Sequence, residues 1–111
     1  MTGQLVADFF AGAFLANAVP HFVAGSMGRR FQTPFANPPG RGLSSPTVNV
    51  LWGFFNFVAG ILLGWRVSAI SLDSPVDAIT FAAGMLALGL FLAHRFGAIY
   101  SPKDSAPEAS R

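Results

Sequence analysis

The stretch Thr47–Trp65, TVNVLWGFFNFVAGILLGW, contains no charged residue and is long enough to cross a lipid bilayer as a helix. Two other apolar runs of similar length, Leu5–Met27 and Val76–Phe96, lie on either side of it. A helix needs about 20 mostly apolar residues to cross the hydrocarbon core. Because the three runs fill most of the 111 residues, the sequence predicts an integral membrane protein.

The composition supports this prediction. Charged residues make up 11% of the chain, against about 25% in an average soluble domain, and are too few to build a polar shell. The length suits a single domain. The net charge of +2 comes from a few basic residues beside the predicted spans, so no nucleic-acid partner is expected. The absence of cysteine excludes disulfides, thiolate nucleophiles and thiolate-bound metals.

The predicted fold is all-α, a bundle of three transmembrane helices in up-down-up order. The bundle forms one domain over residues 1–100, with spans at about 5–27, 47–66 and 76–97. Two serine–proline pairs, at 45–46 and 74–75, mark the starts of the second and third helices. Asp77 occupies the position of the acid in a capping box. The polar tail, residues 101–111, is expected to be mobile.

A long loop rich in proline and glycine, Arg29–Ser45, connects the first two predicted helices. Its prolines and glycines exclude a helix of any length. The apolar residues Phe31, Phe35 and Leu43 are spread through it, which suggests that the loop lies on the membrane interface. Since it is longer than most helix–helix connections, we expect it to be a contact or functional segment.

The basic residues predict the orientation in the membrane. Three spans place the two termini on opposite sides, and the positive-inside rule assigns the more basic side to the cytoplasm. One side receives only Arg66, and the other receives Arg29, Arg30, Arg41, Arg95, Lys103 and Arg111. The sequence therefore predicts a multi-pass protein of the inner or plasma membrane, with the N-terminus outside and the C-terminus cytoplasmic.

Small and polar residues form one narrow stripe on the second predicted helix. The stripe consists of Asn49, Gly53, Asn56, Gly60 and Gly64, at steps of three or four residues. Glycine lets helix backbones approach closely, and asparagine forms hydrogen bonds between helices. This pattern is typical of a helix-packing face, which either joins the three helices of the chain or docks on a partner.

Two histidines are candidate cofactor ligands. His21 and His94 lie toward the same side of the membrane on two different spans, where they could hold a haem or a metal ion together. The simpler interpretation is that His21 hydrogen-bonds inside the protein and His94 reaches the lipid headgroups. We expect no cofactor under this simpler interpretation, and a haem is the alternative.

Asp8 is an acidic residue inside the first span, where an unpaired charge is unfavourable. Arg66 is the only basic residue predicted on the same side of the membrane, so an intramembrane ion pair between Asp8 and Arg66 is expected. The functional alternative is a proton-binding carboxylate, as in small proton-coupled exporters.

These features favour a non-catalytic function over an enzymatic one. We expect a small accessory or assembly subunit that contacts membrane lipids and packs on a larger membrane protein complex or associates with itself. The first alternative is a small homo-oligomeric transporter or channel, with Asp8, Asn49 and Asn56 lining a water-accessible path. The second is a membrane cofactor protein that uses His21 and His94.

Overall fold

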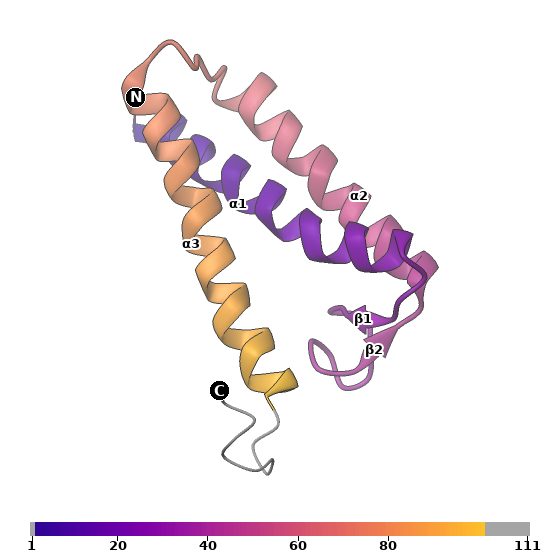
Figure 1. Cartoon of the computed structure of the whole chain (residues 1–111). Coiled ribbons are helices and arrows are strands. Elements are labelled where there is room, and N and C mark those ends of the chain that lie inside the picture. The colour runs from indigo at the N-terminus through magenta and orange to yellow at the C-terminus, as the bar shows by residue number, and fades with distance from the viewer. Residues whose placement is uncertain (1, 102–111) are drawn as a thin grey trace.

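The computed structural model of the protein describes residues 2–101. It contains three long helices, α1 (Thr2–Ser26), α2 (Pro46–Leu62) and α3 (Pro75–Tyr100). Each is long and apolar enough to span a membrane, once the π-helical turn that continues α2 is included. The three predicted helices are therefore confirmed, and consecutive helices run in opposite directions (Figure 1). The predicted mobile tail lies outside the described residues from position 102 onward.

The predicted helix starts are also confirmed. The Ser45 hydroxyl accepts a hydrogen bond from the backbone N–H of Val48 at 3.1 Å, and a proline follows it at the first helical position. The Ser74 hydroxyl accepts from the Asp77 N–H at 3.4 Å in the same way. The Asp77 carboxylate accepts from the backbone N–H of Ser71 at 3.1 Å. Asp77 thus ties the preceding loop to the first turn of α3.

The second helix ends within one residue of the predicted position, but its last turn is not α-helical, and the third helix is longer than predicted. After Leu62 the chain forms a π-helical turn, η1 (Leu63–Val67), in which the Ser68 N–H donates to the Leu63 carbonyl at 2.8 Å. Ala69 then adopts a left-handed conformation with φ of 51°, which ends the helix. The third helix continues to Tyr100, beyond the predicted end near residue 97, because its last turn is hydrogen-bonded to the loop.

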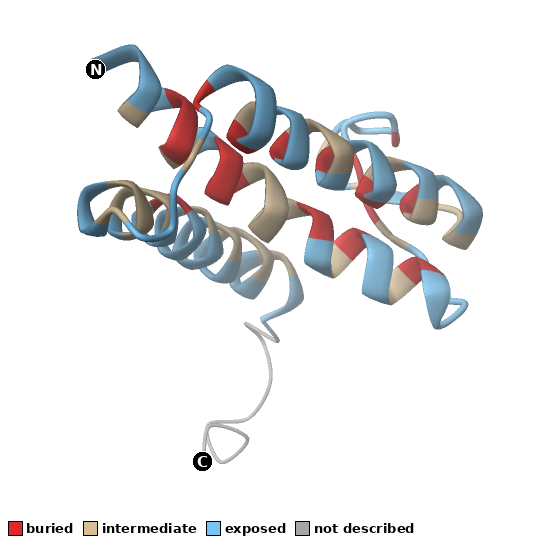
Figure 2. Ribbon diagram, turned by 90° about the horizontal axis from the view of Figure 1, so that it is seen from above, coloured by how far each residue is buried: buried red, intermediate tan, exposed pale blue. Residues whose placement is uncertain are grey.

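Helix α1 lies between the other two and forms the centre of the fold. Both α2 and α3 pack along α1 rather than on each other (Figures 1 and 2). Glycine permits both close approaches: a Cβ at Gly53 of α2 would lie 2.7 Å from the backbone nitrogen of Phe22 in α1. On the other side, Gly84 of α3 lies against the backbone carbonyl of Phe9. The bundle is therefore an open layer of three helices.

The loop between α1 and α2 contains a short antiparallel ribbon that the sequence did not predict. Its strands are β1 (Phe31–Gln32) and β2 (Leu43–Ser44), with Phe31 opposite Ser44. Phe31 does not lie on the outer surface of the protein. Its ring packs inward against Phe96 and Tyr100 of α3, with centroid distances of 4.7 and 6.2 Å. The ribbon therefore closes one end of the three helices, which we call the ribbon end.

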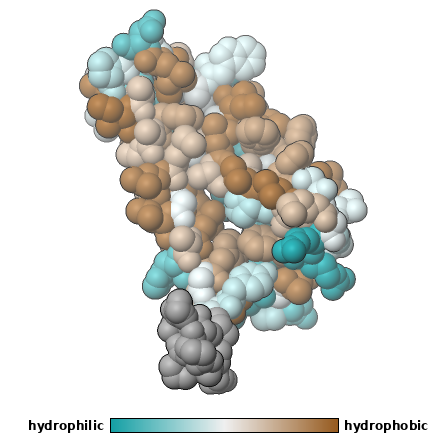
Figure 3. Space-filling model, in the orientation of Figure 1, coloured by the Kyte–Doolittle hydropathy of each residue, from teal (hydrophilic) through white to brown (hydrophobic). Residues whose placement is uncertain are grey.

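The buried interior is small and unusually polar. The buried apolar side chains are all alanines, and the largest fully buried side chains are Asn49, Asn56, Thr33 and Asp8. Many large apolar residues are exposed, and Figure 2 shows exposed positions along all three helices. The space-filling view is hydrophobic over the helices, with hydrophilic side chains gathered toward the ends (Figure 3). Small residues between helices and bulky ones outside are typical of packing in a lipid environment.

Candidate functional site

Asn49 connects α2 to the ribbon end. Its side chain is fully buried, and its amide nitrogen lies 3.0 Å from the Phe31 carbonyl, 3.2 Å from that of Ser44 and 3.1 Å from that of Ser45. The two amide hydrogens are shared among these three acceptors. Because all three neighbours are carbonyl groups, the amide has one orientation, with its oxygen on the opposite side.

His21 of α1 meets that oxygen. Its Nδ1 lies 3.0 Å from Asn49 Oδ1, and the side chain is 4% exposed. Because an amide oxygen only accepts hydrogen bonds, we infer that Nδ1 carries the hydrogen and donates it. Nε2, on the far side of the ring, then keeps its lone pair, and no residue in the range 2–101 is hydrogen-bonded to it. Asn49 thereby selects the tautomer of His21.

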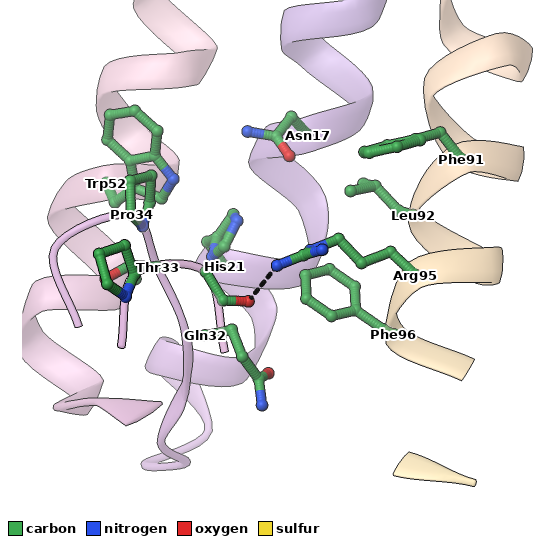
Figure 4. A pocket seen from close by; sticks show the side chains of 12 residues that line it. Asn17, His21, Gln32, Thr33, Pro34, Trp52, Phe91, Leu92, Arg95 and Phe96 are labelled. Atoms are coloured by element: carbon green, nitrogen blue, oxygen red, sulfur yellow. Dashed lines mark hydrogen bonds between the residues drawn. The ribbon is translucent and has the colours of Figure 1, made fainter. Parts of the chain in front are cut away.

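A cavity of about 390 Å³ lies beside His21 at the ribbon end (Figure 4). All three helices and the loop contribute to its wall. Arg95 of α3 extends into it and donates a hydrogen bond to the Gly40 carbonyl of the loop at 2.9 Å. In Figure 4, His21 and Arg95 lie near the middle, with Asn17 above them, Gln32 below them, and Phe91, Leu92 and Phe96 on the side of α3. The main lining side chains are Asn17, His21, Trp52, Phe91, Arg95 and Phe96.

A second cavity of about 290 Å³ adjoins the first between the same three helices. The two cavities share Asn17, Phe91 and Leu92. The second is lined mainly by apolar side chains, and its two amides are bonded to each other: Asn17 Nδ2 donates to Asn56 Oδ1 at 3.0 Å, and Asn56 Nδ2 donates to the Trp52 carbonyl at 2.8 Å. The two cavities therefore lie next to each other along the same three side chains, and the first has the more polar wall.

The second histidine predicted as a ligand lies elsewhere on the surface. His94 is exposed on α3 and does not line the cavity, where its neighbour Arg95 does. Within residues 2–101, no group of three or more histidines and acids is close enough to hold a metal ion. The donor set at the cavity is therefore a single imidazole with amides and a guanidinium.

The stripe of small residues on α2 lies against α1. Asn49, Gly53, Asn56, Gly60 and Gly64 are all buried. A Cβ at Gly60 would lie 2.9 Å from the Ala11 carbonyl of α1, and one at Gly64 would lie 3.6 Å from the Ala11 Cβ. The stripe is therefore covered within the chain, and its two asparagines connect α2 to His21 and to Asn17.

The predicted ion pair between Asp8 and Arg66 is wrong. Both carboxylate oxygens of Asp8 are buried without a hydrogen-bond partner among the described residues. Arg66 is exposed, and its guanidinium lies 5.5 Å from the centroid of the Trp65 ring. The physical reason is the geometry of the π turn. Gly64 and Ser68 occupy its inward side, so Arg66, midway between them, points outward.

Several cavity residues were not recognised as such in the sequence. Arg95 was assigned only to the orientation signal and Trp52 was interpreted as an aromatic anchor at a membrane interface, although both line the cavity. Gln32 joins the same end, because its side-chain oxygen accepts from the Tyr100 hydroxyl at 2.9 Å. The one signal available was the four-residue spacing of Asn17 and His21, which places both on one face of a helix.

The fold and site define a protein with three helices of membrane-spanning length and, at one end of them, a cavity lined by His21 and Arg95 among apolar side chains. No known protein family, curated protein or solved structure matches this chain.

Proposed function

We propose that this protein is a non-catalytic accessory or assembly subunit of the inner or plasma membrane that docks on a larger membrane complex through α3. The observation that carries the proposal is the exposure of α3. It is the most apolar of the three helices, yet only 6% of its most apolar window is buried within the chain. A row of bulky residues, Ile79, Leu86 and Leu90, is 62–67% exposed on the side away from Gly84.

The buried polar groups support a structural role for the helices. The amides of Asn17, Asn49 and Asn56 are committed to hydrogen bonds between elements of the chain. Such bonds hold α1 and α2 together and leave α3 attached along one side. A helix attached in this way offers a broad outer face to a neighbouring membrane protein. Lipid chains compete with that protein for the same face.

The proposed orientation places the ribbon end in the cytoplasm. That end carries Arg29, Arg30, Arg41 and Arg95. Arg66 lies at the opposite end of the helix bundle, in η1. Basic residues beside membrane spans are retained on the cytoplasmic side. Fusing a reporter to each terminus tests this: the C-terminal fusion should report the cytoplasm and the N-terminal fusion the outside.

Site-specific photo-crosslinking in native membranes tests the docking proposal. Leu90 of α3 and Leu51 of α2 are matched controls for each other, because both are leucines and both are 62% exposed. A photoreactive residue at 90 should give one dominant adduct with a defined membrane protein, which also co-purifies at constant stoichiometry, whereas position 51 should give lipid adducts. Lipid adducts alone at both positions would refute the docking role.

The transport alternative is favoured by one observation, the buried and unpartnered carboxyl of Asp8. It requires Asn49 and Asn56 to line an aqueous path, although both are buried in the single chain. Since the sequence contains no cysteine, Asn56→Cys introduces a unique thiol. Reaction of this thiol with a water-soluble maleimide in the intact membrane would support a transporter, and protection would favour the subunit.

The haem alternative is tested by absorbance. A protein that holds haem through His21 should show a Soret band as isolated, and the band should be lost in His21→Phe. Loss in His94→Phe as well would support the ligand pair predicted from the sequence. A pure protein without the band, even after haem is supplied, would exclude this alternative.

A further inference from the structure

A ligand that occupied both adjoining cavities would be elongated and would come from the membrane. His21 and Arg95 each lie five residues before the ends of their helices, which places them about 8 Å inside the ribbon end. The loop covers this end of the cavity through residues such as Thr33, Pro34 and Gly40. Since α2 and α3 do not pack on each other, the free approach is lateral, between these two helices. A lipid-soluble molecule would enter by that route.

The polar end requires a head group that both donates and accepts hydrogen bonds. Because Asn49 Oδ1 takes the hydrogen of His21 Nδ1, His21 Nε2 offers a lone pair, to which a ligand must donate. Arg95 has donors left besides the one bonded to Gly40, and these require an acceptor. A phosphodiester oxygen supplies acceptors only, whereas a ring hydroxyl does both.

The walls of the site favour a flat ring with an apolar chain. Trp52, Phe91 and Phe96 border the first cavity, and aromatic rings pack well on another ring. The second cavity is lined by Phe10, Phe14 and Leu88 beside the shared residues, and its amides are already bonded to each other or to the backbone. It suits a hydrocarbon tail that makes no hydrogen bonds.

We propose that these cavities bind an isoprenoid quinol, with a ring hydroxyl donating to His21 Nε2, a ring oxygen accepting from Arg95, and the isoprenoid chain along Phe91 and Leu92. The ring occupies the polar cavity, and the chain extends through the apolar one. Asn49 is a positioning residue, since it holds the His21 tautomer that accepts the hydroxyl. The assignment does not depend on the docking role of α3.

Tryptophan fluorescence provides a direct test, because quinones quench it on contact. The chain has two tryptophans, and Trp65 is exposed away from the site, so Trp65→Phe leaves Trp52 as the only reporter. The purified variant is titrated in lipid nanodiscs with a benzoquinone that carries one isoprenoid unit. Quenching should saturate, and the corresponding quinol, added without oxygen, should displace the quinone because its hydroxyl donates to Nε2.

Matched substitutions locate the site. His21→Phe and Arg95→Gln should each raise the apparent Kd at least tenfold, whereas His94→Phe and Arg66→Gln should leave it within twofold of the parent. Leu92→Phe fills both cavities without touching the His21–Asn49 bond and should also abolish saturation. Leu86→Phe, on the exposed face of α3, is its control. Far-UV circular dichroism confirms that each variant is folded.

Two outcomes would overturn the assignment. Quenching that never saturates and is equal in the parent, Leu92→Phe and Leu86→Phe would mean that the quinone only dissolves in the bilayer. Saturable quenching that phosphatidylglycerol reverses and the quinol does not would show that the site binds a phospholipid headgroup. Since Leu92→Phe keeps the His21–Asn49 and Arg95–Gly40 hydrogen bonds of the site, a folding failure of His21→Phe does not prevent either conclusion.

Discussion

Truncating Asn49 should destabilise the protein more than truncating any other residue of the α2 stripe. Asn49→Ala removes the acceptor of the His21 Nδ1 hydrogen and the donor to the Phe31 carbonyl. A buried group left without its partner costs about 1–3 kcal/mol. The Phe31 and Ser44 carbonyls share the amide hydrogens, so we count them as one group; with the His21 N–H this predicts a loss of about 2–6 kcal/mol. The Ser45 carbonyl adds nothing, because the backbone N–H of Asn49 still donates to it at 3.0 Å.

This loss is measurable by reversible unfolding in mixed detergent micelles, followed by circular dichroism. Asn56→Ala is the matched control, since it leaves only Asn17 without its partner between helices and should cost about half as much, roughly 1–3 kcal/mol. Hydrogen exchange of the loop amides should rise in Asn49→Ala and not in Asn56→Ala, because Asn49 is hydrogen-bonded to the ribbon and Asn56 is not.

A double-mutant cycle tests the link to His21 itself. The coupling free energy between Asn49→Ala and His21→Ala should lie at about 0.5–3 kcal/mol, as for groups in direct contact. A change in unfolding free energy below about 1 kcal/mol for Asn49→Ala, or zero coupling with His21, would refute the inference that this bond organises the ribbon end.

Three further substitutions probe other parts of the fold. Gly84→Ala should lower the free energy of unfolding by about 2 kcal/mol or more, because its Cβ would meet the α1 backbone. Gly89→Ala is the control: it has open space around it and should be neutral or stabilising when its free energy of unfolding is measured in the same way. Ala69→Gly should stabilise by about 1 kcal/mol by relieving the left-handed conformation, and a lower unfolding midpoint would contradict this. Tyr100→Phe removes the bond to Gln32, so amide exchange should rise in the loop by up to about tenfold, equivalent to 1.4 kcal/mol, with no change in the middle of α2.

The helices could be predicted because their signals are local. A run such as Thr47–Trp65 can bury its backbone polar groups in lipid only as a helix, and the serine–proline pairs mark where α2 and α3 begin. The end of α2 was less predictable. Whether Leu63–Val67 forms an α or a π turn depends on the inward packing of Gly64 and Ser68, and that packing also determined which way Arg66 points.

The site could be predicted only in part. The spacing of Asn17 and His21 places both on one face of α1, and the α2 stripe marks Asn49 and Asn56 as interhelical residues. No pattern in the sequence pairs His21 with Asn49 or Asn17 with Asn56, since that requires the relative height of two helices. The position of Arg95 at the cavity could not be predicted either, because it depends on the hydrogen bond that Arg95 donates to the Gly40 carbonyl of the loop.

The sequence by itself determined that this chain forms three apolar helices, where two of them start, and which face of α2 is small and polar. These properties follow from residue type and spacing along one segment. The tertiary structure decided that α1 lies in the middle, that the loop folds into a ribbon below it, and that His21 keeps a free Nε2 beside a cavity. Such features depend on contacts between segments far apart in the chain, and the close approach of glycines to neighbouring backbones sets which contacts form.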